Sequence, residues 1–409
     1  MPRHWQVKKL KSISESIQYG YTESSSKVNN GPKFLRITDI QNNKVNWDSV
    51  PFCKINNNIK NRYLLKDGDL VFARTGATVG KSYLIKGAIP EAIFASYLIR
   101  VRVNQEINEK YLSYFFYSPR YWEQITEGQV GIGQPNVNGT KLGQLDIPIP
   151  PLPEQQAIVS RIEELLSDLE NGKQQLQTAH QQLRVYRQSL LKVAFEGKLT
   201  NKEVKVGELP KGWKWVTLGD VSVNVEYGSA TKSKVSGKVP VLRMGNIQKG
   251  SFVWDDLVFT DDDDEIKKYL LKKNDVLFNR TNSAELVGKT AIYKGERPAI
   301  FAGYLIRINR IESLIDANYI TYYLNTQAAK HYGNSVRSFG VNQSNINGTK
   351  LKTYPLPLPL LDEQQLIVSE LESKLTICDK IEETISQSLK QAETLRQSIL
   401  KKAFEGRLV

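Results

Sequence analysis

Two patterns of hydrophobic positions alternate along this chain of 409 residues. Residues 1–150 and 209–356 carry short apolar and β-branched runs, such as Leu70-Val-Phe-Ala, separated by Gly, Asn and Pro. Such runs are typical of strands joined by turns, while Tyr111 to Tyr117 and Tyr319 to Leu324 favour short helices. We therefore predict a mixed α/β domain in each of these two regions.

A helical pattern follows each region, over residues 151–200 and 357–409. Apolar residues recur there every three or four positions, which is the heptad spacing of a coiled coil. Prolines precede both segments, and Gly197 and Gly406 suit a left-handed cap at their ends. We predict one long helix in each segment and a linker at residues 201–208. The predicted seam consists of Ile158, Ile162, Leu165, Leu169, Leu176, Leu183 and Leu190 in the first helix, and Ile367, Leu371, Ile381, Ile385, Leu395 and Ile399 in the second.

The two halves of the chain form an internal repeat, at an offset of 206 to 209 residues. Ile93-Phe-Ala-Ser-Tyr-Leu-Ile-Arg returns at Ile300, and Leu190-Leu-Lys-Val-Ala-Phe-Glu-Gly returns at Ile399. A period of this length is that of a folded domain with its connection. We expect two globular domains joined by two long antiparallel coiled-coil helices, with pseudo-twofold symmetry. This arrangement suits a target with two similar halves, such as duplex DNA.

Charge narrows the choice of partner. The chain has a net charge of +13, and the segments 154–195 and 363–404 together carry −1, so the other residues carry +14. Basic domains beside neutral helices favour a polyanion as partner. No apolar run reaches the roughly 18 residues of a membrane span, so we expect a cytoplasmic protein without membrane contact. The two Cys and three His lack metal-ligand spacing, and we expect no metal site.

One segment resembles a catalytic motif. Gly76-Ala-Thr-Val-Gly-Lys-Ser is similar to a phosphate-binding P-loop, but it is one residue short, and the second copy at Asn282 to Thr290 lacks the first glycine. The chain also lacks the glycine-rich cofactor loop of a methyltransferase, repeated carboxylate pairs and a nucleophile elbow. We predict no catalytic residue and no cofactor, with nucleotide hydrolysis at residues 76–82 as the weaker enzymatic alternative.

Two signatures, each present twice, carry a resemblance to a known family. A Pro-Leu-Pro-Glu-Gln-Gln type sequence begins the first helix at Pro151, and a Leu/Ile-Leu-Lys-x-Ala-Phe-Glu-Gly sequence ends both helices at Gly197 and Gly406. In this order the whole chain resembles the specificity subunit of type I restriction-modification systems.

The resemblance implies a DNA sequence-specificity subunit that catalyses nothing itself and whose two target recognition domains each read one half of a bipartite target. It also implies two modification subunits that carry S-adenosylmethionine, and restriction subunits that cleave DNA with ATP and Mg. The alternative is a coiled-coil scaffold whose basic domains bind protein or RNA.

Residues shared by the two copies are predicted to build the scaffold or to contact phosphates, which position a protein on DNA without specifying sequence. Asn138-Gly-Thr-Lys-Leu, matched at Asn347, is expected to be a fold element or a partner contact. The shared cations assigned to phosphates are Arg74, Lys81, Arg280 and Lys289. Arg36 and Arg243 suit a structural ion pair as well as a DNA contact.

Polar residues that differ between the copies are the candidates for reading bases, because two domains with different half-sites must differ where bases are touched. In the first domain they are Thr22, Lys27, Thr75, Thr78, Gln134 and Asn136. In the second domain they are Thr231, Lys232, Lys234, Asn282, Ser283, Asn342, Gln343 and Asn345.

Overall fold

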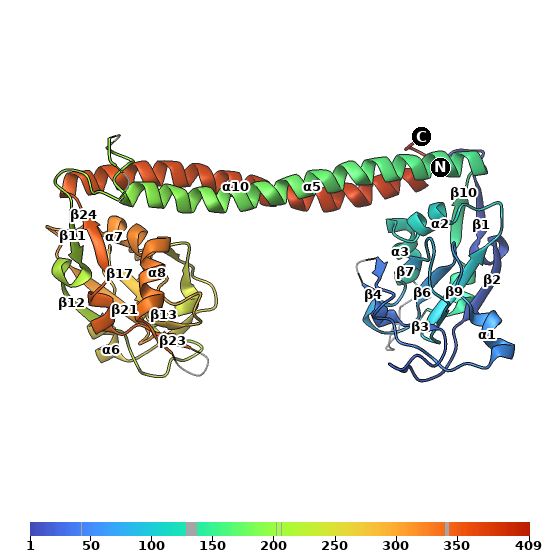
Figure 1. The fold of residues 1–409 in the computed structure, drawn as a ribbon, viewed down its shortest axis with the longest axis horizontal. Coiled ribbons are helices and arrows are strands. Elements are labelled where there is room, and N and C mark those ends of the chain that lie inside the picture. Colours follow the sequence, from blue (N-terminus) through green and yellow to red (C-terminus); the bar gives the residue numbers. More distant parts are fainter. Residues whose placement is uncertain (42, 128–136, 202, 206, 340–342) are drawn as a thin grey trace. The chain divides into compact units, whose positions relative to one another are not determined.

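The computed structural model describes residues 1–41, 43–127, 137–201, 203–205, 207–339 and 343–409. Two compact units make up the chain. Unit 1 contains Met1–Gln177 and Ser386–Val409, and unit 2 contains Thr178–Ile385. Each unit holds one α/β domain together with parts of two long helices (Figure 1). The predicted mixed fold, with two domains and two long helices, is confirmed.

A four-stranded antiparallel sheet forms the centre of the first domain, in the order β2-β9-β6-β7. Leu70 and Phe72 of β6 belong to one hydrophobic core, and Val71 belongs to another. Successive side chains of a strand point to opposite faces. The continuous apolar run therefore arises because both faces of the sheet are covered. The four strands are Ser14–Tyr19 (β2), Leu98–Val103 (β9), Leu70–Ala73 (β6) and Ser82–Leu84 (β7).

Smaller strand pairs and short helices surround this sheet. The strand pairs are Gln6–Lys9 (β1) with Asp146–Ile149 (β10), Lys33–Leu35 (β3) with Ala92–Phe94 (β8), and Ile40–Gln41 (β4) with Lys44–Val45 (β5). The helices are Asn57–Tyr63 (α1), Glu109–Phe115 (α2), Pro119–Glu127 (α3) and Gly139–Gly143 (α4). Asparagine side chains start three of them, since Asn56, Asn108 and Asn138 each accept a backbone N–H of the first turn.

The second domain repeats this plan within unit 2. Its central sheet has the order β12-β21-β17-β19, and its first strand pair carries a bulge at Ser222, the counterpart of the bulge at Ser14. The same irregularity in both copies shows that the repeat extends to the strand register. The four strands are Ser222–Tyr227 (β12), Leu305–Arg310 (β21), Val276–Asn279 (β17) and Thr290–Ile292 (β19).

The remaining elements of the second domain cover this sheet. Two strand pairs are Lys214–Thr217 (β11) with Pro355–Leu358 (β24), and Ile247–Gln248 (β14) with Ser251–Phe252 (β15). One sheet of three strands contains Val258–Thr260 (β16), Val239–Leu242 (β13) and Ile300–Phe301 (β20). Another sheet of three contains Thr281–Asn282 (β18), Ser344–Asn345 (β23) and Ser338–Phe339 (β22). The helices are Asp263–Tyr269 (α6), Ala317–Leu324 (α7), Gln327–Val336 (α8) and Gly348–Lys352 (α9).

The two long helices, Leu152–Phe195 (α5) and Leu361–Phe404 (α10), have 44 residues each. In unit 1, Ile158 shares a core with Leu400, and Lys173 lies 2.6 Å from Glu393. In unit 2, Leu190 shares a core with Ile367. The helices are therefore antiparallel in each unit. No helix in the described part of the chain is long and apolar enough to cross a lipid bilayer.

The predicted seam differs from the structure at two positions of α10. Ile381 and Leu395 are 44% and 51% exposed, whereas Cys378 and Ala392, three residues earlier, are buried. The buried positions of α10 recur every seven residues, because one row of its heptads faces α5 and the next row faces outward. The predicted positions Ile158, Ile162, Leu190, Ile367, Leu371, Ile385 and Ile399 are buried, and Leu165, Leu169, Leu176 and Leu183 are half-buried.

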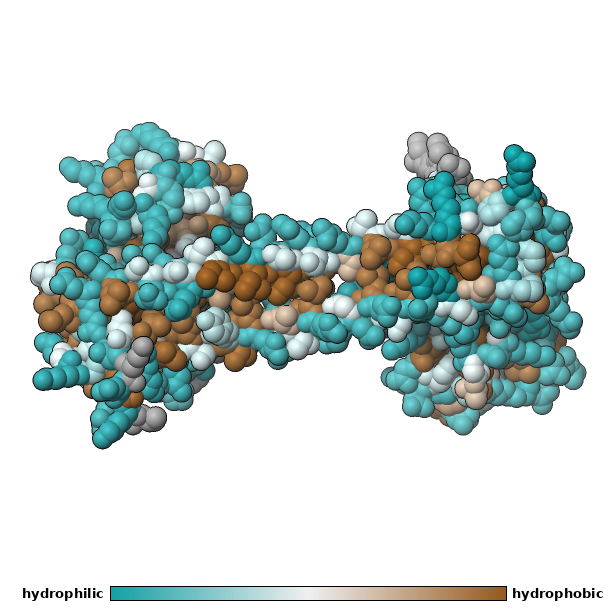
Figure 2. Space-filling model, turned by 90° about the horizontal axis from the view of Figure 1, so that it is seen from above, coloured by the Kyte–Doolittle hydropathy of each residue, from teal (hydrophilic) through white to brown (hydrophobic). Residues whose placement is uncertain are grey.

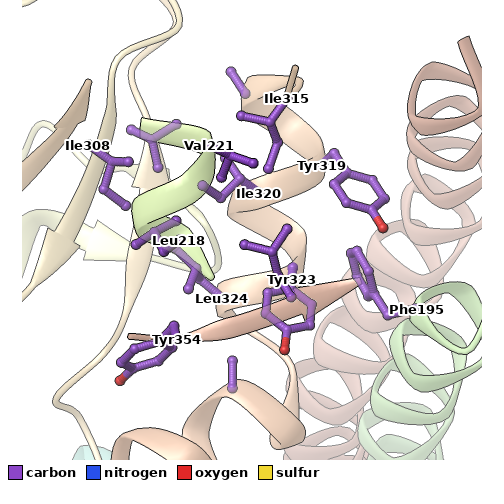
Figure 3. Close-up of a cluster of buried hydrophobic side chains, with 14 of the residues drawn as sticks. Phe195, Leu218, Val221, Ile308, Ile315, Tyr319, Ile320, Tyr323, Leu324 and Tyr354 are labelled. Carbon is purple, nitrogen blue, oxygen red and sulfur yellow. The ribbon is translucent and has the colours of Figure 1, made fainter. Parts of the chain in front are cut away.

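Each long helix ends on an aromatic contact with a domain. Phe195 of α5 points towards α7 and lies 5.0 Å from Tyr319 and 5.2 Å from Tyr323, measured between ring centres (Figure 3). Phe404 of α10 lies 5.1 Å from Tyr111 and 5.3 Å from Phe115. The domain of unit 1 is thus covered by the end of α10, and the domain of unit 2 by the end of α5.

Glycine caps follow these phenylalanines, as the sequence predicts. Gly197 and Gly406 have φ angles of +75° and +71°, which residues with a Cβ rarely adopt. A Cβ at Gly197 would overlap Pro210, and one at Gly406 would overlap Pro2. The caps therefore fix the helix ends against the first residues of each repeat.

Candidate nucleic-acid interface

Arg280 lies where three segments of unit 2 meet. Its backbone N–H donates to the Tyr304 carbonyl over 3.0 Å, and its own carbonyl accepts from the Ile346 N–H over 2.9 Å. Its Nη1 donates to the Gly303 carbonyl over 3.2 Å, and the guanidinium lies 4.8 Å from the centre of the Tyr227 ring. These contacts hold residues 280–283, 302–304 and 344–346 together.

The predicted reading residues of unit 2 gather beside Arg280. Asn282 pairs with Ser344 in the antiparallel ladder of β18 and β23, and Asn345 Nδ2 donates to Thr281 Oγ1 over 2.9 Å. Ser283 and Gln343, at the ends of these short strands, are exposed. Asn342 lies outside the described residues. The fold thus brings two predicted loops, 60 residues apart in sequence, into one small sheet.

Arg74 occupies the same position in unit 1. Its N–H donates to the Tyr97 carbonyl over 3.0 Å, its carbonyl accepts from the Val137 N–H over 3.0 Å, and its guanidinium lies 5.0 Å from the centre of the Tyr19 ring. Thr75 and Thr78 are half-buried next to it, and Lys81 is exposed. Gln134 and Asn136 lie outside the described residues.

The repeated Asn-Gly-Thr-Lys-Leu motif supports these arginines. Asn138 and Asn347 cap α4 and α9, where each side chain accepts a backbone N–H. The Gly139 N–H donates to the Tyr19 hydroxyl over 2.8 Å, and the Gly348 N–H donates to the Tyr227 hydroxyl over 2.7 Å. The motif therefore acts as a fold element that fixes the ring on which each arginine stacks.

The chemistry at these two positions suits an anion contact. The Nε of Arg74 and of Arg280 is buried and has no hydrogen-bond partner within the described ranges. Beside them, Tyr97 and Tyr304 are 61% and 51% exposed. A guanidinium recognises phosphate, and an exposed ring can stack on a base. Arg74, Tyr19 and Tyr97 form one cluster, and Arg280, Tyr227 and Tyr304 form the other. We call them the arginine–tyrosine clusters.

Sequence reasoning found the arginines of these clusters but not the tyrosines. All four tyrosines recur at the offset of the repeat. The available signal was this recurrence, but recurrence alone does not distinguish an exposed ring from a buried one, and it does not show which residue lies beside the arginine.

The other predicted loops carry fewer free groups. Thr22, Lys27 and Lys232 are exposed. Thr231 Oγ1 donates to Glu265 over 3.1 Å, and Lys234 forms an ion pair of 3.0 Å with Asp261. Lys289 is half-buried and lines a cleft described below.

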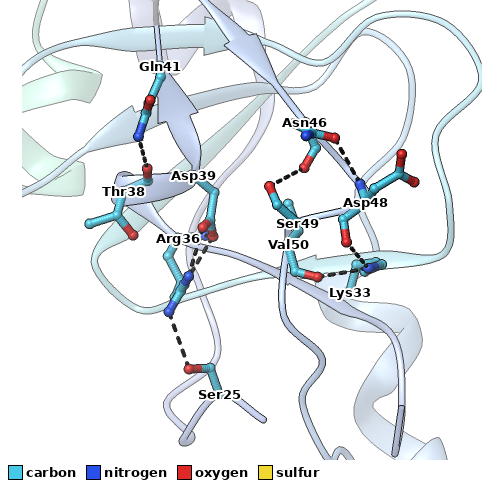
Figure 4. A network of polar contacts seen from close by, with 10 residues as sticks. All are labelled: Ser25, Lys33, Arg36, Thr38, Asp39, Gln41, Asn46, Asp48, Ser49 and Val50. Atoms are coloured by element: carbon cyan, nitrogen blue, oxygen red, sulfur yellow. Dashed lines mark hydrogen bonds and ion pairs between the residues drawn. The ribbon is translucent and has the colours of Figure 1, made fainter. Parts of the chain in front are cut away.

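Arg36 and Arg243 both take part in ion pairs, one of the two roles predicted for them. Arg36 donates from Nε and Nη2 to Asp39 over 3.0 and 2.8 Å, and from Nη1 to Ser25 (Figure 4). The hydrogen bond to Asp39 raises the pKa of Arg36. Arg243 Nη2 lies 3.2 Å from the Asp256 carboxylate.

The P-loop resemblance does not extend to the structure. Gly76–Thr78 forms a single 3₁₀ turn, and the residues after Lys81 form the strand β7, whereas a P-loop leads into a helix whose N-terminus faces the phosphates. Within the described residues, no group of three or more His, Cys, Asp and Glu side chains could hold a metal ion.

A family comparison decides the identity of these domains. The model of the type I restriction modification DNA specificity domain matches residues 2–178 and 210–391. The chain belongs to this family. It is 28% identical over 382 residues to the StySPI specificity subunit of Salmonella potsdam, covering 91% of this chain and 82% of that protein. It is 26% identical over 422 residues to the EcoKI specificity subunit of Escherichia coli K12, covering 100% and 90%.

Solved structures show the same fold. A chain from a study of the assembly and conformational transition of the type I restriction-modification system has a TM-score of 0.77 at 19% identity, covering 100% of this chain and 99% of that one. The HsdS subunit from Thermoanaerobacter tengcongensis has a TM-score of 0.66 at 19% identity, covering 100% and 98%. The chain is a DNA sequence-specificity subunit of the type I class, and the scaffold alternative is not favoured.

Proposed function

We propose that the specificity subunit reads a bipartite DNA target, one half with each domain. The arginine–tyrosine clusters carry this proposal, because the same cation and rings recur in both domains while the polar residues around them differ. The shared residues contact the DNA backbone in both half-sites, and the differing ones, such as Ser283 and Gln343, contact base edges.

The long helices supply the second part of the proposed function, the docking of two modification subunits. Figure 2 shows hydrophobic side chains gathered along these helices. Val185, Tyr186, Ile377 and Ile381 of unit 2 are each at least 44% exposed, and Leu395 of unit 1 is 51% exposed. Apolar side chains in a helical row at this exposure favour burial against further helices.

In this proposal the specificity subunit supplies recognition and no catalysis. The modification subunits carry S-adenosylmethionine and methylate adenine, and the restriction subunits use ATP and Mg to cleave DNA. The domains' net positive charge draws the complex to DNA and makes its binding depend on salt.

The first test is a genome-wide map of N6-methyladenine. Cells would express the specificity subunit with the modification subunit of its own system, and control cells would lack the specificity subunit alone. We expect a split motif, two short defined blocks around a fixed unspecified gap, that disappears in the control. If the modification subunit is expressed and complexed but no motif depends on this chain, the proposed function is wrong.

A further inference from the structure

A deep cleft of about 1630 Å³ lies within unit 2, between the long helices and the second domain. Its walls come from α5 between His180 and Phe195, from α7 and α8, and from Leu375 and Glu382 of α10. All of these residues belong to unit 2. The reading of DNA by the loops near Arg280 does not account for this cleft.

Positive charge gathers in the cleft. Nine Lys and Arg residues line it, with two His, against three Glu. Ion pairs neutralise some of these cations, as with Lys249 and Arg187 at Glu382. No ion pair to the described residues neutralises Arg184, Lys289 or Lys330. Burial and the nearby charge of Lys289 lower the pKa of Lys330. An anionic ligand would relieve this repulsion.

Hydrophobic and aromatic side chains also line the cleft. They include Phe195, Leu375, Tyr322 and Trp215, and Trp215 is 61% exposed. A DNA duplex presents phosphates outward and would leave these side chains uncovered. Aromatic and cationic side chains together are instead typical of protein interfaces that receive an amphipathic helix. Acidic residues on such a helix would face the cations.

A helix with side chains is about 10–12 Å wide. The cleft, with a volume of about 1630 Å³, is large enough to receive a short helical segment.

Two of the cations that line the cleft, Arg184 and Lys330, belong to the second copy and not to the shared scaffold. Ser118 and Thr326 start matching helices, so Lys330 corresponds to Trp122 and His331 to Glu123. Arg184 corresponds to Glu393 at the offset of the helix ends. A ligand that requires these cations would bind at one of the two repeats.

We propose that this cleft binds an acidic amphipathic segment of a partner protein, with its carboxylates on Arg184 and Lys330 and its apolar side chains on Leu375 and Tyr322. The inference goes beyond the proposed function, because the reading of half-sites does not use this cleft and, of the exposed apolar residues proposed to dock the modification subunits, Val185 alone lines it.

The first experiment measures the binding of a fluorescent peptide to the full chain. The probe is a 14-residue helix with Leu at helical spacing and Glu elsewhere. The double substitution Arg184→Glu and Lys330→Glu, which reverses two charges of the cleft, should weaken binding of the peptide at least tenfold. The matched control is Lys267→Glu with Lys272→Glu, exposed positions of unit 2 outside the cleft, and should bind like the unaltered chain. Equal losses in both pairs, or none in the first, would overturn the proposal.

The second experiment identifies the occupant in the assembled complex. A photo-crosslinking benzoylphenylalanine at Tyr322, inside the cleft, is compared with one at Tyr304, outside it. We expect position 322 to crosslink to an acidic segment of a subunit of the same system. Crosslinks to DNA at position 322, or peptide displacement by a random-sequence duplex, would assign the cleft to DNA. Absence of any crosslink at position 322 would also contradict the proposal.

Discussion

At the scale of single residues, Arg74 and Arg280 combine three properties. Each stacks on a tyrosine ring, each is anchored through both backbone groups, and each has a buried Nε without a hydrogen-bond partner in the described part of the chain. Arg36 differs, because its guanidinium is saturated by Asp39 and Ser25. The stacked arginines are therefore the better candidates for phosphate contacts.

Replacing Arg280 with Ala should weaken the binding of every duplex by roughly tenfold and reduce the salt slope of log K by about one, without changing the preferred sequence. The reason is that a phosphate contact supplies affinity but no base discrimination. Duplex titrations at several salt concentrations measure this, with Lys267→Ala as the control. An unchanged salt slope with a lowered melting temperature would show that Arg280 acts only in the fold.

The sequence predicted these arginines because they recur, but it could not reveal their surroundings. Tyr97 and Tyr304 are followed directly by buried Leu98 and Leu305, and only the fold decides which neighbour faces solvent. In the same way, the partners of Arg243 and Lys234 are distant or weakly patterned in sequence. Residue types were predictable here, and side-chain partners were not.

At the scale of elements, the ends of the long helices complete the cores of the domains. Phe404 is 1% exposed in the core of unit 1, and Phe195 is 7% exposed in the core of unit 2. Each phenylalanine contacts two rings of the helix against which it packs. Each cluster fastens a helix end to a domain.

Phe404→Ala should destabilise unit 1 by about 3–5 kcal/mol, because a buried ring is lost and a cavity remains. Hydrogen exchange should accelerate in α2 of unit 1 and remain unchanged in α7 of unit 2. Phe195→Ala should produce the reverse pattern, and Leu395→Ala, on the exposed face of α10, should change neither. Equal acceleration in both units after either change would contradict this assignment.

The boundaries of the long helices were largely predictable, since prolines precede them and glycines with positive φ end them. The phase of the seam was harder to predict. A heptad pattern contains two apolar rows, and the sequence does not say which row meets α5 and which, with Ile381 and Leu395, faces outward. That choice depends on what else covers the helices.

At the scale of the whole molecule, each unit is assembled from both long helices, so α5 and α10 belong partly to each unit. A change of helix length therefore affects both units, and in the proposed function it also affects the gap between the half-sites. The repeat in the sequence predicted the two domains. It did not predict that unit 1 includes residues 386–409, because a contact between distant segments leaves no local pattern.

Removing one heptad from each helix, residues 170–176 and 390–396, tests this role. The two segments face one another in unit 1 around the ion pair of Lys173 and Glu393, so their joint removal preserves the pairing. Seven residues correspond to about 10 Å of helix, or roughly 3 base pairs. We expect the unspecified gap of the methylation motif to shorten by about this amount. Removal from α10 alone should abolish methylation, and an unchanged gap after the joint removal would contradict the proposal.

The contact between Phe404 and the domain of unit 1 also determines the order in which the chain folds during synthesis. Unit 2 is continuous from Thr178 to Ile385, so its core is complete once those residues have emerged from the ribosome. The domain synthesised first must wait for residues 386–409, a delay of roughly 10–40 s at 5–20 residues per second. During that time Tyr111 and Phe115 lack the ring that covers them. The first domain to be made is therefore the last to be completed, and a chain whose synthesis stops before Phe404 carries its defect in the domain that was made first.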